Sequence, residues 1–438
     1  MTGVSDQHDL PLRPMRHQPL HQPPLVRAPE AASTVHLVTL AAACAPLLAG
    51  IVLMGWRAAS VAGMAIAGCA GIEWLYYRLT RQPAMTSRSH AVLTGTLLAL
   101  TLPAFVPWYV PLVGAVFAII IGKAVFGGLG HFVWQPALVG RLAVAVMFPA
   151  ALAAPAPSYP DAWPVLAQSN ILIGDVRSYG HMPDYEPWHG RPAPAKGDAF
   201  LLKRPEAILA PLTRPAPAVT ALRAGRGAYS SLWSVGREPS PYPAALGEMP
   251  PIEDLIVGAV PGGIGETSAA MIVVAGLYLI YRHYVKWQLP VAIVLSAAVT
   301  AAIAPIQLVG PDEALSSFWW PIAREGFDVG VMYVSYHLFS GGLLLAALFL
   351  ATEQTTRPVT TGGQVLFGVG CGAGAMLLKL YTSVPIPCYL AVLAMNTFTQ
   401  TIDRMWRPRV LGRGRWPLLR RLAAHVASPP ASAGSDEA

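Results

Sequence analysis

Charge is scarce in this sequence. Only 12% of its 438 residues are Asp, Glu, Lys or Arg, whereas 54% are apolar, and the mean hydropathy is +0.47. Because soluble domains carry about 25% charged residues, this composition excludes an ordinary soluble protein. It predicts an all-α protein that crosses a membrane many times.

Cysteine is scarce as well. The four cysteines stand alone in the sequence: Cys44, Cys69, Cys371 and Cys388. None has the Cys-x-x-Cys or Cys/His spacing of a metal site, so we expect them to be small buried apolar residues. We expect the chain itself to bind no metal and no iron–sulfur cluster.

Several motifs are missing too. No Walker loop, zinc-protease motif, nucleophile elbow or dinucleotide fingerprint occurs in a fitting context. Residues 1–33 are rich in Pro, His and Arg and have no apolar core, which is typical of a disordered tail rather than a signal peptide. The basic segment 404–438 indicates an anchor on anionic lipid, and we expect no nucleic-acid partner.

Long apolar windows, by contrast, are abundant. About 20 apolar residues suffice to cross a bilayer, and such windows predict about ten spans. They lie near 34–56, 59–79, 89–106, 107–125, 131–153, 266–286, 288–308, 328–350, 363–381 and 384–402. Pro103 and Pro107 interrupt the third, which is short.

Basic residues indicate the orientation. They cluster before the first span, after the second, sixth and eighth spans, and after the last. With ten spans these groups share one side, which the positive-inside rule makes the cytoplasm. We therefore expect both termini in the cytoplasm and a plasma (inner) membrane location. The expected parts are a tail (1–33), a five-span half (34–153), an outer loop (154–261), a second five-span half (262–403) and a basic tail (404–438).

Two segments resemble each other weakly. LTGTLLALTLP begins at Leu93, and FSGGLLLAALFLA begins at Phe339. In the expected topology they enter the membrane from opposite faces, as in an inverted repeat, whose site lies at the repeat interface. The alternative is that Leu- and Gly-rich membrane helices look alike by chance.

The run GGIGETSA, from Gly262, is the most informative motif. Gly263, Gly265, Glu266 and Thr267 precede about 20 apolar residues. A Gly-rich turn that opens a helix can seat an anion or phosphate, and a carboxylate at the mouth of a span is a functional candidate. The alternative is a helix cap by Thr267 or Ser268, with Glu266 on the positive helix end.

A second unusual stretch is GKAVFGGLG. It places Lys123 beside Gly127, Gly128 and Gly130, with Arg141 further on. The glycines allow positive φ and the close approach of a ligand, and the two cations could hold a phosphate. Snorkelling of both cations to the cytoplasm is the alternative. The Gln135-Pro136 pair suggests a discontinuous helix.

Three further residues bear on function. Glu73 lies within the second span and is the best candidate for an ion path, since a carboxylate at that depth is costly. His337 is expected to be a satisfied interfacial histidine rather than a ligand. Glu353, at the end of the eighth span, is expected in a polar cytoplasmic turn.

Taken in order, these motifs resemble the RnfD/NqrB family. They are TGTLLALTLP, GKAVFGGLG with QPALVGR, GGIGETSA, HLFSGGLLLAALFLATEQTTRP and AMNTFTQTIDR, and they cover about residues 85–150 and 250–405. Members are membrane subunits of Rnf and sodium-translocating NADH:quinone reductase complexes. The resemblance implies a urea-transporter-like helical fold with an inverted 5+5 repeat, other subunits as partners, and redox-driven Na⁺ or H⁺ movement.

The resemblance also implies FMN bound through a phosphoester to a threonine of the outer loop. The best match to the acceptor motif is PAPAVTAL, in which Thr220 takes the acceptor position. Pro217 replaces the motif's Ser and Arg214 its Asp, so an ordinary proline-rich loop is the alternative. Non-covalent FMN at the glycine turn is a third possibility.

The function expected from all this is a membrane subunit of a flavin-dependent, ion-translocating electron-transport complex. It would work as part of a redox-driven translocase rather than as an enzyme alone, with the flavin carrying the electrons. The alternatives are a flavin-free channel or transporter of the same fold, or a degenerate scaffold subunit.

Overall fold

The computed structural model describes residues 32–80, 88–152, 209, 252–258, 262–309, 315–318 and 327–406, and the structural statements below concern these residues. The described part is predominantly helical, as the composition predicted. Thr220 lies outside it, as do residues 1–31 and 407–438 of the two predicted tails.

The first group of helices occupies residues 32–152. It comprises α1 (Ala32–Met54), α2 (Trp56–Thr80), α3 (Arg88–Thr101), α4 (Tyr109–Val116), the π-helix η1 (Phe117–Ala124), α5 (Pro136–Met147) and α6 (Pro149–Leu152). α3 ends before Pro103, and α4 begins after Pro107, which confirms the predicted interruption. Pro136 is the first residue of α5, and the Gln135 side chain caps it by accepting a hydrogen bond from the backbone N of Ala137 (2.7 Å), so the predicted helix break is also confirmed.

The second group occupies residues 252–405. It comprises α11 (Ile252–Val257), α12 (Ala269–Tyr281), α13 (Gln288–Ile303), α15 (Phe327–Phe339), α16 (Leu343–Leu345), the π-helix η5 (Ala346–Leu350), α17 (Thr361–Tyr381) and α18 (Pro387–Met405). Between α13 and α15, strands β1 (Ile306–Val309) and β2 (Leu315–Phe318) form a short antiparallel pair in which Ile306 faces Phe318. This pair was not anticipated.

Three described helices, α1, α2 and α17, are long and apolar enough to cross a membrane. A fourth span is formed if Gly330–Phe339 and Leu343–Leu350 are counted together, since they are bent by 62° at a short break. The sequence showed no sign of this bend beyond its Ser-Gly-Gly run. Shorter apolar helices, α12 and α13 among them, make up much of the remainder.

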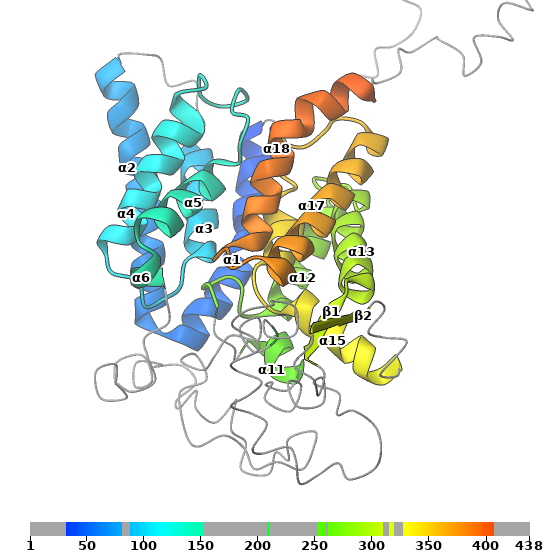
Figure 1. The fold of residues 1–438 in the computed structure, drawn as a ribbon. Helices are drawn as coiled ribbons and strands as arrows, with labels where there is room; N and C mark the ends of the chain where they lie inside the picture. Colours follow the sequence, from blue (N-terminus) through cyan, green and yellow to red (C-terminus); the bar gives the residue numbers. More distant parts are fainter. Residues whose placement is uncertain are drawn as a thin grey trace, which may run out of the picture.

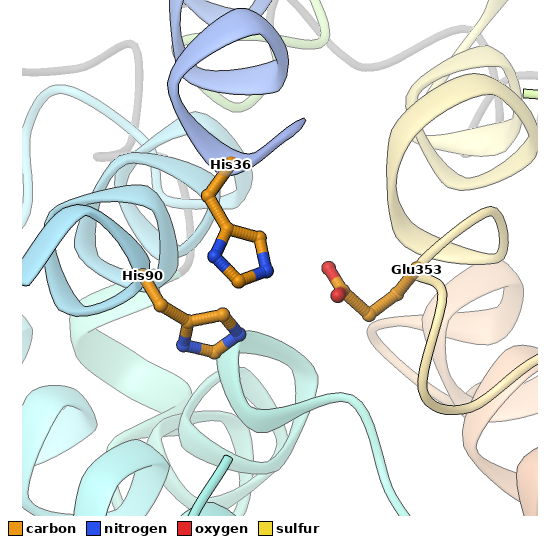
Figure 2. Close-up of side chains that lie close together, drawn as sticks. All are labelled: His36, His90 and Glu353. Atoms are coloured by element: carbon orange, nitrogen blue, oxygen red, sulfur yellow. The ribbon is translucent and has the colours of Figure 1, made fainter. Parts of the chain in front are cut away.

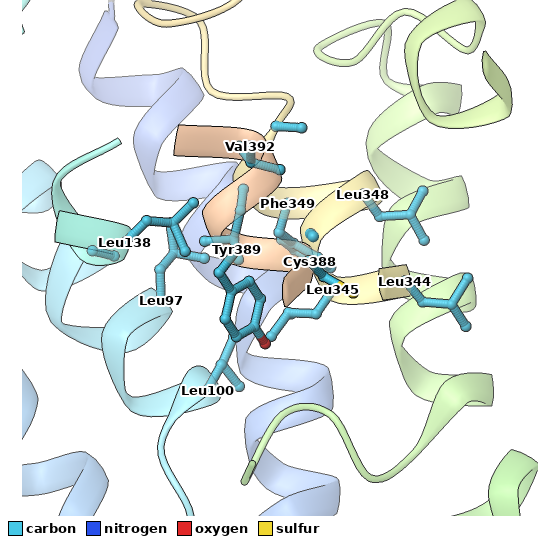
Figure 3. Packing of buried hydrophobic residues seen from close by; sticks show 14 of the residues in the cluster. Leu97, Leu100, Leu138, Leu344, Leu345, Leu348, Phe349, Cys388, Tyr389 and Val392 are labelled. Atoms are coloured by element: carbon cyan, nitrogen blue, oxygen red, sulfur yellow. The ribbon is translucent and has the colours of Figure 1, made fainter. Parts of the chain in front are cut away.

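Helix α1 joins the two groups, lying between them in Figure 1 and packing against α3 on one side and α12 on the other. Small residues permit the closest approaches, as is usual between membrane helices. A Cβ at Gly50 of α1 would lie 2.1 Å from the Ile264 carbonyl oxygen, and one at Gly372 of α17 would lie 2.1 Å from that of Ile293. The apolar core, which Figure 3 shows around Tyr389, is continuous across both groups.

Candidate functional site

The GGIGETSA turn begins α12. Ser268 is the N-cap, and its Oγ accepts a hydrogen bond from the backbone N of Met271 at 3.5 Å. Thr267 instead donates to the carbonyl of Ile264 at 3.4 Å. Of the two capping candidates, the structure therefore selects Ser268.

The backbone of this turn packs directly onto the end of α3. Ile264 N donates to Leu102 O, and Gly265 N donates to Leu100 O, both at 2.8 Å. A Cβ at Gly265 would lie 2.4 Å from Leu100 Cδ2. These N–H groups are engaged within the protein, so the glycines serve close packing, and the turn as it stands does not fit a flavin phosphate.

Glu266 is buried and bound by neutral donors. Its Oε2 accepts a hydrogen bond from Gly263 N at 2.8 Å, and its Oε1 accepts one from the hydroxyl of Tyr389 on α18. Figure 3 shows Tyr389 close to Leu100 and Leu345. Glu266 thereby links the start of α12 to α18.

Lys123 and Glu73 form a buried ion pair. Lys123 Nζ donates to both carboxylate oxygens of Glu73, at 3.0 and 2.9 Å, and lies 3.1 Å from His90 Nδ1. Lys123 is 1% exposed, so the alternative of a snorkelling lysine is wrong. It is wrong for Arg141 as well, which is 4% exposed and donates through Nε to the Thr101 carbonyl at 3.0 Å.

Local backbone geometry places Lys123 in this pair. It lies in the π-helix η1, a type of irregularity that is frequent at functional sites. The turn that follows has positive φ at Gly127 (100°), Gly128 (93°) and Gly130 (88°), as predicted from their residue type. Gly128 N donates to the Lys123 carbonyl at 3.1 Å and closes the end of the helix.

Next to the ion pair, three side chains converge: His36 of α1, His90 of α3 and Glu353, which follows η5. One nitrogen or oxygen atom from each lies within 4.8 Å of the others. The two imidazole rings meet edge to face at 4.9 Å, and Figure 2 shows the Glu353 carboxylate pointing toward both. Glu353 lies outside the helical span, where burial raises the pKa of its carboxyl and the positive charge of Arg357 offsets part of that rise.

A small cavity of about 20 Å³ opens beside this trio. Its polar lining includes His36, Thr39, Thr352, Glu353 and Gln354. Such a volume holds about one water molecule and is far too small for a flavin. His36 and His90 were not predicted as site residues, and their positions in the first turns of two apolar spans were the available signal.

A second buried lysine lies in the other group of helices. Lys379 of α17 donates to the carbonyls of His337 and Ser340, both at 2.9 Å, and to Ser340 Oγ at 3.0 Å. His337 is 2% exposed, and both of its ring nitrogens are buried without a hydrogen-bond partner in the described part of the chain. The expectation of a satisfied interfacial histidine is therefore wrong.

The predicted site residues thus fall into two places. Gly263, Gly265, Glu266 and Thr267 share one turn, whereas Glu73, Lys123, Gly127 and Gly128 belong to the ion pair and the turn beside it. Lys123 and Glu266 contact different partners. Thr220 lies outside the described residues.

An apolar helical bundle with buried, paired charges defines a class, that of polytopic membrane proteins with polar sites between their helices. The comparison with known proteins specifies the family. Residues 20–412 match the model of the NQR2, RnfD, RnfE family, and the chain belongs to this family.

Curated relatives agree with this assignment. The chain is 30% identical over 397 residues to the D subunit of an ion-translocating oxidoreductase complex of Halorhodospira halophila, covering 90% of this chain and 95% of the relative. It is 31% identical to the D subunit of the Na⁺-translocating ferredoxin:NAD⁺ oxidoreductase complex of Acetobacterium woodii, with 89% and 93% covered. A third relative, 26% identical with 90% and 95% covered, is the proton-translocating counterpart of Clostridium ljungdahlii.

Proposed function

We propose that this chain is the D-type membrane subunit of an ion-translocating electron-transport complex, and that it carries FMN and couples electron flow to ion movement. The supporting observation is the family match over residues 20–412, which includes both helical groups and their buried polar residues. An ion pair held between helices is the kind of intramembrane charge found on ion paths.

The proposed architecture has ten spans, an inverted 5+5 repeat and both termini in the cytoplasm. Two parallels between the helical groups support the repeat. Each group contains a buried histidine shortly before a similar Gly-containing segment, His90 before Thr94-Gly95 and His337 before Ser340-Gly341, and each contains a π-helix. The topology predicts that a Ser231→Cys variant reacts with an impermeant thiol reagent added from outside; reaction only after lysis would contradict it.

FMN is proposed to be attached at Thr220, since the glycine turn offers its N–H groups to α3 rather than to a ligand. When bound, the flavin supplies the one- and two-electron chemistry. The described residues form the helical framework and place its buried charges. In-gel flavin fluorescence of the denatured protein should be present in the parent and absent in Thr220→Ala. A band that persists in the variant would move the attachment elsewhere.

The test of the function as a whole is isolation of the affinity-tagged full chain from its native membrane. We expect co-purification of further subunits of an oxidoreductase complex, with about one covalent flavin per copy of this chain. A chain that is isolated alone and without flavin would favour the alternatives, a flavin-free transporter or a scaffold. Ion flux through liposomes containing the purified chain would then separate those two.

A further inference from the structure

The trio of His36, His90 and Glu353 is the one group of buried titratable residues in the described chain with three potential ligand atoms so close together. Two nitrogens and a carboxylate oxygen at such spacing are compatible either with a transition metal or with a bound proton. The contact that His90 makes through Nδ1, on the side of the ring away from Glu353, decides between a metal and a proton.

A metal-bound imidazole usually donates its other N–H to a carboxylate or carbonyl. Here the neighbour of His90 Nδ1, at 3.1 Å, is Lys123 Nζ, which Glu73 neutralises at 2.9 Å. A protonated amine only donates, so Nδ1 accepts this hydrogen bond. In neutral His90 the proton is then on Nε2, and Nε2 has no lone pair for a metal.

The same arrangement orients His90 toward Glu353. Figure 2 shows a nitrogen of His90 on the side of the ring that faces the carboxylate, and His36 presents a nitrogen to the same place. The N–H of neutral His90 is therefore on the side of the ring that faces Glu353, while the lone pair of His36 remains to accept a proton. His36 Nδ1 is buried without a hydrogen-bond partner.

The lining of the adjacent cavity fits a proton or a water better than Na⁺. Hard cations need several oxygen ligands, but two of the three converging side chains, His36 and His90, offer nitrogen, which suits transition metals and protons rather than Na⁺. Glu353 supplies the one carboxylate in this lining, and the remaining space holds about one water.

We propose that His36 and Glu353 form a proton-binding site, with His90 as a positioning residue fixed by Lys123. A hydronium ion that reaches the cavity breaks one of its O–H bonds as the proton forms a bond to the His36 nitrogen or to a Glu353 oxygen, and a neutral water remains. The formal charge of the trio changes from −1 to 0, and no electron is transferred. That this proton is the coupling ion rests on the function proposed above.

Several charged and titratable groups lie near the site, and Tyr284 lines the cavity beside it. Those facing it or its ion pair are Glu73 and Cys69 of α2, Lys123 of η1, and Arg357, whose Nη2 donates to the Tyr284 carbonyl at 3.3 Å. The Glu73–Lys123 pair is neutral overall, so the charge of the trio is balanced mainly by Arg357 and by the bound proton.

The test is an infrared pH titration of the purified full-length protein in lipid nanodiscs, in Na⁺-free buffer and again with about 100 mM Na⁺. We expect one carboxyl transition between about pH 5 and pH 9, where histidine and buried carboxyl groups titrate. Na⁺ should leave its midpoint unchanged. Glu353→Gln should abolish it, and His36→Gln should shift it by at least about one pH unit.

His337→Gln is the matched control, since it removes another buried imidazole and should leave the midpoint in place. Competition by Na⁺, no transition in the wild type, or tight Zn²⁺ binding that requires all three residues would each overturn the proposal. If a variant fails to fold, the wild-type titration with and without Na⁺ still tests the proposed proton site. The titration uses no electron donor, so its result does not depend on the electron-transport function. A flavin-free protein that shows the carboxyl transition would refute only the electron-transport function. A flavin-containing protein that lacks the carboxyl transition would refute only the proton site.

Discussion

The two helical groups each bury a lysine, and they stabilise its charge in different ways. Lys123 is held by a carboxylate, Glu73, and by an imidazole, His90. Lys379 is held by two backbone carbonyls and a hydroxyl at the break between α15 and α16. A helix end carries a partial negative charge, so Lys379 acts as the cap of α15.

The difference shows which of these lysines can take part in ion chemistry. The two carbonyls and the hydroxyl that bind Lys379 are neutral groups, and no carboxylate is among these partners. The Lys123 site contains a carboxylate and adjoins two histidines and a second carboxylate, so its charge can change with bound protons. We therefore propose a structural role for the second region and ion chemistry for the first.

Among the variants that test the difference between the two lysine sites, Lys123→Met is expected to lower stability most. This change leaves the Glu73 carboxylate buried without its cation, which typically costs about 3–5 kcal/mol. We expect the largest fall in thermal midpoint of the purified protein in detergent. Arg78→Met, on the exposed end of the same α2 helix, is the control and should have little effect; equal midpoints for the two variants would contradict the buried pair.

Tyr389→Phe extends the comparison to a carboxylate held by neutral donors. It removes one of the two hydrogen bonds to Glu266, and hydrogen bonds to charged groups are worth about 1.5–3 kcal/mol. We expect a fall in thermal midpoint smaller than that of Lys123→Met. A larger fall would mean that Glu266 depends on Tyr389 more than on the Gly263 N–H.

Lys379→Met removes the cap at the α15 break. Two buried carbonyls lose a donor, at about 1–3 kcal/mol for a buried group left unsatisfied. Stability should fall while the pH transition of the Glu353 carboxyl stays in place. Movement of that transition would couple the two regions and contradict their separate roles.

Glu266→Gln should have the smallest effect on stability. The amide oxygen can accept from Gly263 N while the amide nitrogen donates to the Tyr389 hydroxyl, so both contacts can persist, and the main loss is the favourable charge near the start of α12, about 0.3–1 kcal/mol. Electron transfer by the isolated complex tests the other role of Glu266. A site role predicts reduced electron transfer at unchanged protein level, and full activity would leave Glu266 as a structural residue.

The sequence predicted the framework well because its signals are local. Apolar windows and the prolines at 103, 107 and 136 determine where helices lie and break, and glycine type foretold the positive φ angles at Gly127 and Gly128. The motifs of the family resemblance were confirmed by the family match.

The clusters of charged residues could not be predicted from such local signals. Glu73 and Lys123 are 50 positions apart, and His36 and Glu353 come from opposite ends of the chain, so only tertiary packing shows that they meet. The GGIGETSA turn illustrates the same limit: its glycines suggested a ligand cradle, but Leu100 of a distant helix takes up the space beside Gly265.

The central claim, that Glu73 and Lys123 neutralise each other inside the first region, is tested most directly by a double-mutant cycle. Thermal stability would be measured for the parent, Glu73→Gln, Lys123→Met and the double variant in the same detergent. Each single change leaves one buried charge unpaired, whereas the double variant leaves none, so we predict that it recovers at least about 2 kcal/mol of the summed losses. Losses that simply add would contradict the claim.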